Sequence, residues 1–162
     1  MPEDSGKAAE LDDIERIVAS LNKNGVDFMI IGGYAVIFHG FVRNTKDLDI
    51  LIRRSPDNAR RAVTALEEAG CACPELTPQL FMSGKGITFG DPPMRVDILA
   101  DIRGVAFDEA WSRRQTSRFG PLEANFIGLD DLISNKEAVA RPQDLVDAQK
   151  LRLAREKMGR PP

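Results

Sequence analysis

Cysteine and histidine are scarce in this sequence, which limits the metal sites that it can form. Its 162 residues include two cysteines, Cys71 and Cys73, and one histidine, His39. A structural zinc site takes four cysteine or histidine ligands, and two cysteines separated by one residue do not provide them. The sequence therefore excludes a thiolate zinc site, and we expect reduced thiols in a cytoplasmic protein.

Long apolar runs and an excess of positive charge are also absent. No apolar stretch approaches the ~20 residues that cross a bilayer, so we expect no membrane segment. The net charge of -3 provides no overall basic field to hold nucleic acid nonspecifically. Residues 1–10 are polar and are expected to form a disordered tail, whereas residues 11–160 have the composition of a single globular domain.

The first half of the chain alternates between helical and strand patterns. Apolar residues recur at helical spacing over 11–21, and the wholly apolar run at 28–31 predicts a buried strand that ends at Gly32-Gly33. We expect one or two helical turns at 34–39 and a second strand at 47–53, followed by a capped helix.

The second half continues this alternation and then becomes helical. Strands are predicted at 86–90 and 94–100, followed by a short helix and a hairpin at 115–126. Amphipathic patterns at 129–139 and 142–157 predict a terminal helical pair. This order indicates an α+β fold, in which a small mixed β-sheet carries flanking helices and a C-terminal helical pair.

Three acids on the predicted strands are candidates for a divalent-metal site. Side chains alternate faces along a strand, so Asp47 and Asp49 point the same way while Leu48 and Ile50 point into the core. Two carboxylates roughly 6–7 Å apart repel each other unless a cation lies between them, and Mg²⁺ prefers such oxygen ligands. Asp97 joins them if its strand lies beside the first. An acid-x-acid pattern alone also describes a strand with one solvated face.

The glycine pair Gly32-Gly33 favours the metal interpretation over a solvated strand. It follows a buried strand and precedes a helical turn, where glycines let the backbone approach a phosphate and exposed amides bind its charge. Tight strand-to-helix turns need glycine in any case, so the pair is weak evidence by itself. Combined with Asp47 and Asp49 on the next strand, it indicates a nucleotide site.

Together these residues resemble the polymerase-β nucleotidyltransferase superfamily, whose signature is a strand ending in Gly-Gly or Gly-Ser, a short helix, a strand with Asp-x-Asp, and a later third acid. The resemblance covers roughly residues 26–151. It is greatest for the minimal bacterial branch that includes AbiEii-type abortive-infection toxins and small antibiotic nucleotidyltransferases. Arg43, Thr45 and Lys46 carry that part of the resemblance, together with the segment 129–147.

The resemblance implies a role for each candidate residue. Asp47 and Asp49 would bind two Mg²⁺ or Mn²⁺ ions, and Asp97 would be the third ligand, nearest the attacking group. The candidate nucleotide-binding residues are Gly32, Gly33, Arg43, Thr45 and Lys136.

Several of these assignments have a plain structural alternative. Arg43 is also interpretable as a solvated loop residue, and Lys136 as a surface lysine paired with a neighbouring acid. Asp144 and Asp147 are interpreted as helix-surface or cap residues without chemistry, and Arg141-Pro142 as a helix boundary. One departure from the family pattern is Gly33, which stands where many members have serine.

The leading functional hypothesis is metal-dependent transfer of a nucleoside monophosphate from an NTP to an acceptor hydroxyl, with release of pyrophosphate. The acceptor is open: an RNA end, a protein side chain or a small hydroxylated compound. The alternative is a catalytically silent nucleotide-binding or partner-binding module of a toxin–antitoxin-type pair. A phosphohydrolase would use the same acids. The assembly is also open: the chain could form a homodimer or bind a cognate partner protein.

Overall fold

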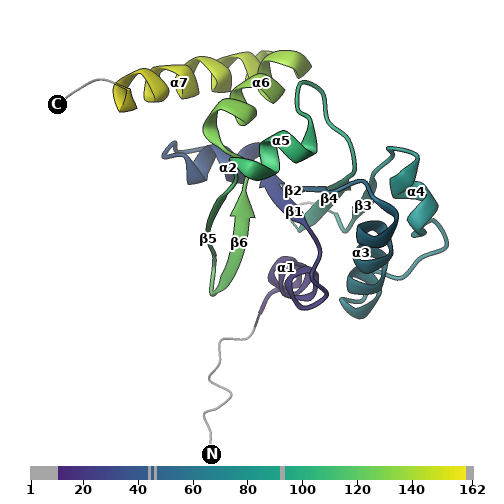
Figure 1. Ribbon diagram of the computed structural model, residues 1–162. Helices are drawn as coiled ribbons and strands as arrows, with labels where there is room; N and C mark the ends of the chain where they lie inside the picture. Colours follow the sequence, from purple (N-terminus) through teal and green to yellow (C-terminus); the bar gives the residue numbers. More distant parts are fainter. Residues whose placement is uncertain (1–10, 44, 46, 92–93, 160–162) are drawn as a thin grey trace, which may run out of the picture.

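The computed structural model describes residues 11–43, 45, 47–91 and 94–159. The expected tail at 1–10 and Lys46 lie outside these residues. A mixed six-stranded sheet with the strand order β3-β4-β2-β1-β6-β5 forms the centre of the fold, and helices cover both of its faces (Figure 1). The predicted α+β architecture, including the C-terminal helical pair, is confirmed. No helix of the described residues is long and apolar enough to span a membrane.

The sheet combines parallel and antiparallel neighbours. Its strands are β1 (Phe28–Ile31), β2 (Asp47–Ile52), β3 (Ile87–Phe89), β4 (Arg95–Leu99), β5 (Gln115–Phe119) and β6 (Leu122–Phe126). Strand β1 pairs with β2 antiparallel and with β6 parallel, whereas β2 and β4 are parallel. The hairpins β3-β4 and β5-β6 form the two outer parts of the sheet. Strand β2, which carries the acid pair, is therefore held on both sides.

The helices divide between the two faces. They are α1 (Asp13–Lys23), α2 (Gly32–Phe38), α3 (Pro56–Glu68), α4 (Pro78–Met82), α5 (Phe107–Ser112), α6 (Leu129–Val139) and α7 (Pro142–Met158). Helices α1, α3 and α4 lie on one side of the sheet, and α2, α5, α6 and α7 lie on the other (Figure 1). Each face has its own apolar core, because successive strand residues point to opposite sides.

Strand β2 shows how this alternation positions the acids. Leu48 and Ile50 are fully buried in the core under α1 and α3. Their neighbours Asp47 and Asp49 consequently face the side that carries α2, α6 and α7. The orientation predicted from the period of two is confirmed.

Two helices begin with a hydroxyl cap followed by proline, and one of them escaped the sequence prediction. Ser55 caps α3, whose first residue is Pro56, as expected. Thr77 caps α4 in the same way before Pro78, but α4 has only five residues and shows no apolar period. The helix was missed because a single turn is too short for a helical pattern to appear.

Candidate active site

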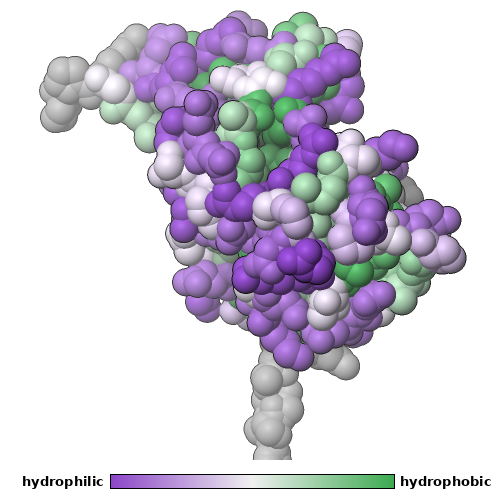
Figure 2. Space-filling view, turned by 45° about the vertical axis from the view of Figure 1, so that its right-hand side comes forward, coloured by the Kyte–Doolittle hydropathy of each residue, from purple (hydrophilic) through white to green (hydrophobic). Residues whose placement is uncertain are grey.

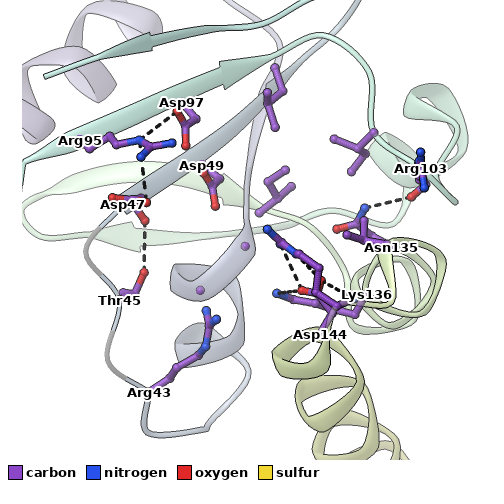
Figure 3. A pocket seen from close by; sticks show the side chains of 17 residues that line it. Arg43, Thr45, Asp47, Asp49, Arg95, Asp97, Arg103, Asn135, Lys136 and Asp144 are labelled. Atoms are coloured by element: carbon purple, nitrogen blue, oxygen red, sulfur yellow. Dashed lines mark hydrogen bonds and ion pairs between the residues drawn. The ribbon is translucent and has the colours of Figure 1, made fainter. Parts of the chain in front are cut away.

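The candidate site is a cleft between the acid-bearing face of the sheet and the C-terminal helical pair. Its volume is about 800 Å³, and its lining comes from β1, α2, β2, β4, α6 and α7 (Figure 3). All eight residues proposed from the sequence line this one cleft: Gly32, Gly33, Arg43, Thr45, Asp47, Asp49, Asp97 and Lys136. The structure therefore brings together residues that are up to 104 positions apart, from Gly32 to Lys136.

The parallel pairing of β2 with β4 sets the arrangement of the acids. Asp49 lies directly opposite Asp97, and Asp47 lies opposite Arg95. Figure 3 shows the three carboxylates on one side of the cleft, with Lys136 and Asp144 on the other. Periodicity does not reveal that β4 lies beside β2, so the position of Asp97 depended on its spacing and on the family pattern.

Asp49 lies close enough to Asp97 for the two side chains to share a hydrogen bond. Burial raises the pKa of Asp49 to about 7, and a hydrogen bond with Asp97 and the charges of Asp97 and Asp47 add to this effect. The positive charge of Lys136 opposes it. In addition, the Oδ1 atom of Asp47 is buried without a hydrogen-bond partner. Three carboxylates in this condition favour the binding of a cation, which relieves their repulsion.

Arg95 and Thr88 occupy part of this acidic surface. The Arg95 Nε atom lies 3.5 Å from Asp97 Oδ1 and 4.0 Å from Asp47 Oδ2, and the Thr88 hydroxyl donates a hydrogen bond to Asp97. In this arrangement, no three carboxylate, histidine or cysteine side chains among the described residues enclose a metal position. Sequence reasoning assigned no role to Arg95, although its spacing of two from Asp97 places both on one strand face.

The glycine turn packs directly against the acids and the loop before β2. Gly32 has a φ of 68°, and a Cβ atom there would collide with the Asp49 carboxylate. A Cβ atom on Gly33 would lie 2.6 Å from the Thr45 hydroxyl oxygen and would also collide with the Arg43 guanidinium. The space that a serine at position 33 would need is therefore filled by Thr45 and Arg43. This is a structural reason for the departure from Gly-Ser.

Lys136 is buried, with two acids of α7 around its ammonium group. Its Nζ atom lies 3.2 Å from Asp144 Oδ1 and 3.4 Å from Asp147 Oδ2, and the three residues are 4%, 2% and 1% exposed. The interpretation of Asp144 and Asp147 as surface residues was therefore wrong, although Asp144 does cap α7. The cause is tertiary: α7 folds back on α6, so that its first turns face the end of α6.

Two arginines extend this ion-pair network into the cleft. Arg43 Nε lies 3.5 Å from Asp147 Oδ2, and Arg141 Nε lies 2.7 Å from Asp144 Oδ2. Burial alone would raise the pKa of Asp144, but hydrogen bonds from Arg141 and Lys136 outweigh it, and the pKa is lowered. Arg141 does mark a helix boundary, as predicted, and it also lines the cleft. The cleft thus has an acidic wall on the sheet and a basic wall on the helical pair.

Further lining residues had no signal in the sequence. Arg103 follows β4, and Asn135 precedes Lys136 on α6, where its side-chain amide donates to the Arg103 backbone oxygen at 2.9 Å (Figure 3). Leu99, Ile102 and Val139 add apolar surface. These residues come from β4, the segment that follows it and α6, and their proximity arises only from the fold.

Comparisons with known proteins agree with this architecture. No protein-family model and no curated protein sequence matches the chain. A solution structure of the antibiotic-resistance factor ANT(2″)-Ia is similar, with a TM-score of 0.52 and 13% sequence identity over 91% of this chain and 83% of that chain. A crystal structure of ANT(2″)-Ia in complex with adenylyl-2″-tobramycin gives a TM-score of 0.53 and 13% identity over 90% and 87%.

The chain shares the overall fold of these ANT(2″)-Ia structures. The fold expected from the resemblance is supported to that extent. The narrower assignment to the abortive-infection toxin branch stays a prediction.

Proposed function

We propose that this protein transfers a nucleoside monophosphate from an NTP to an acceptor hydroxyl and releases pyrophosphate. The observation that carries the proposal is the contact between the Gly32 turn and the carboxylate of Asp49, which itself lies opposite Asp97. A phosphate bound at the turn would thereby lie beside the acids. The similar fold of ANT(2″)-Ia, whose crystal structure contains an adenylylated tobramycin, supports transfer to a hydroxyl compound.

The acids fit a divalent metal by their chemistry. All donors are carboxylate oxygens, one of which is buried and unpartnered, and the raised pKa of Asp49 reflects burial and neighbouring negative charge that a cation would offset. Asp47, Asp49 and Asp97 would hold Mg²⁺ or Mn²⁺, expected as two ions. When bound, the metal would neutralise phosphate charge and activate the attacking hydroxyl. Arg95 competes for the same oxygens before the metal binds.

The other residues of the cleft would bind and orient the NTP. Gly32 and Gly33 allow the triphosphate to approach the backbone, and Arg43 and Thr45 lie beside Gly33. Lys136 adds positive charge on the opposite wall. In the reaction, the acceptor oxygen forms a bond to the α-phosphorus while the bond from that phosphorus to pyrophosphate breaks. The hydroxyl proton passes to a carboxylate of the site and then to water.

Calorimetric NTP binding in the presence and absence of Mg²⁺ tests the proposal. We expect binding that requires the metal and that is lost in Asp49→Asn. Glu75→Gln is the matched control, because Glu75 is an exposed acid outside the cleft. Binding that is independent of the metal, or unchanged in Asp49→Asn, would contradict the proposal.

A second candidate function is a nucleotide-binding or partner-binding module without catalysis, as in a toxin–antitoxin-type pair. The observation that favours it is Arg95, a built-in counter-cation between two of the acids. This candidate predicts NTP binding without transfer of label from an α-labelled NTP to any acceptor.

A further inference from the structure

The acidic and the basic side chains that line the cleft differ in number and in how many of them are neutralised by an ion pair. Four described lining residues are carboxylates, namely Asp47, Asp49, Asp97 and Asp144. Five are cations, namely Arg43, Arg95, Arg103, Lys136 and Arg141. The excess of positive charge is small. The acids and the cations differ more in how many of them are free to pair with a second substrate.

Most carboxylates of the cleft have a partner. In the acidic wall, Arg95 lies within ion-pair distance of Asp47 and Asp97, and the proposed metal would bind all three acids. The fourth, Asp144, accepts hydrogen bonds from Lys136 and from Arg141. With the proposed metal bound to the three acids of the sheet, an acceptor that carries ammonium groups would find no further unshared carboxylate among the described residues that line the cleft.

The cations are less fully engaged. Within the described part of the chain, the exposed guanidinium of Arg103 has no ion-pair partner, and only its backbone oxygen accepts a hydrogen bond. The Arg141 side chain is 73% exposed although its Nε atom contacts Asp144. An ammonium group near either residue would be repelled, whereas an anion would be attracted.

The surface around the cleft agrees with a polar acceptor. Figure 2 shows a largely hydrophilic face, with hydrophobic residues gathered in the hollow beneath the C-terminal helices. Leu99, Ile102 and Val139 contribute apolar lining next to Arg103 and Asn135. A sugar or base packed on this lining would bring a phosphate within reach of the arginine.

We propose that the acceptor carries a phosphate group close to its reacting hydroxyl, and that Arg103 binds this phosphate. The guanidinium group suits the task because it binds phosphate oxygens through two parallel hydrogen bonds. The acceptor class thus differs from the polyamine tobramycin seen adenylylated in ANT(2″)-Ia. This inference rests on the proposed nucleotidyl transfer and specifies its second substrate.

The test uses the full chain with Mg²⁺ and an α-³²P-labelled NTP set. One arm offers sugar phosphates and the matching unphosphorylated sugars, a second offers short RNA with a free 3′ hydroxyl, and a third offers tobramycin. We expect label on phosphate-bearing acceptors at least tenfold above their unphosphorylated counterparts, with the first two arms identifying the source of the phosphate.

Variants of Arg103 separate binding from a merely structural role. Arg103→Glu should raise the KM for the phosphate-bearing acceptor at least tenfold with little change in kcat, and Arg103→Lys should restore much of the affinity. Arg118→Glu is the matched control, because Arg118 is an exposed arginine on β5 that does not line the cleft. Its KM should equal that of the parent protein.

Two kinds of result would overturn the proposal, and they are distinguishable. Preferential labelling of tobramycin or of unphosphorylated sugars, or an unchanged KM in Arg103→Glu, would refute the acceptor class while nucleotidyl transfer stands. Metal-dependent NTP binding without any labelled product would count against transfer and therefore against both proposals. Absence of NTP binding would refute the proposed function itself.

Discussion

The two walls of the cleft carry charge in different ways. On the sheet, Asp47, Asp49 and Asp97 face one another, and their main cationic neighbour, Arg95, stays 3.5 Å or more from their oxygens. On the helical pair, Lys136 is buried between Asp144 and Asp147 within ion-pair distance of both. Among the described residues, Arg95 pairs with two of the three acids of the acidic wall and Asp49 forms no ion pair, whereas both acids beside Lys136 are paired with it. The difference indicates that the first is built to bind a ligand and the second to hold α7 on α6.

The largest effect is expected from Lys136→Met. This change leaves Asp144 and Asp147 buried with fewer partners, and breaking a buried ion pair in this way costs about 3 kcal/mol or more. Urea denaturation measures the loss, with Lys150→Met on the exposed side of α7 as the control. A loss below about 1 kcal/mol would show that the ion pairs of Lys136 with Asp144 and Asp147 do not stabilise the packing of α7 on α6.

Asp49→Asn should have the opposite effect on the metal-free protein. Asp49 keeps its proton up to a pKa of about 7 in the folded state, but loses it near its ordinary pKa of 3.8 when unfolded. The contribution of Asp49 to the stability of the parent protein therefore falls as pH rises from about 4 to about 7 and is level above that.

The asparagine variant lacks this loss, so its free energy of unfolding should exceed that of the parent by an amount that grows over the same pH range. We expect a difference of about 2 kcal/mol at pH 8, which is less than the full pKa difference implies because the carboxyl is partly exposed. Thermal or urea unfolding at pH 4.5 and pH 8 measures it. A variant less stable than the parent at pH 8 would contradict the account of the acidic wall.

Gly33→Ser tests how the glycine turn contacts the loop before β2. The added side chain needs space that Thr45 and Arg43 occupy, so we expect a stability loss of about 1–2 kcal/mol and weaker NTP binding. Thr45→Ala in the same chain removes one of the obstructing groups and should recover part of both losses. A double-mutant cycle without coupling between positions 33 and 45 would refute this contact.

The smallest effect is expected from Arg95→Gln. Loss of its charge beside two carboxylates should strengthen Mn²⁺ binding in the absence of NTP by about fivefold, equivalent to about 1 kcal/mol. Titration calorimetry measures the change, with Arg118→Gln as the control. Weaker Mn²⁺ binding would mean that Arg95 positions Asp97 instead of competing with the metal.

The sequence predicted the acidic wall better than the basic wall, for a physical reason. A period of two in a short strand places Asp47 and Asp49 on one face whatever the rest of the fold does. The adjacency of β2 and β4 is a long-range pairing that periodicity does not show, so Asp97 was placed through its spacing and a family pattern.

For Asp144 and Asp147, local patterns were misleading. Charged residues in the first turns of a helix usually face water, and only the return of α7 onto α6 buries them against Lys136. Arg103 follows β4 and lines the cleft through another tertiary contact, in which its backbone oxygen accepts a hydrogen bond from Asn135 of α6. Its position on a loop carries no periodic signal at all.

The most direct test of the central claim compares NTP labelled at the α-phosphate with NTP labelled at the γ-phosphate, each incubated with the protein, Mg²⁺ and a cell extract. The account predicts that only the α-label moves onto an acceptor, that the γ-label leaves as pyrophosphate, and that both events stop in Asp49→Asn. Release of free γ-phosphate without a labelled acceptor, or unchanged transfer in Asp49→Asn, would contradict it.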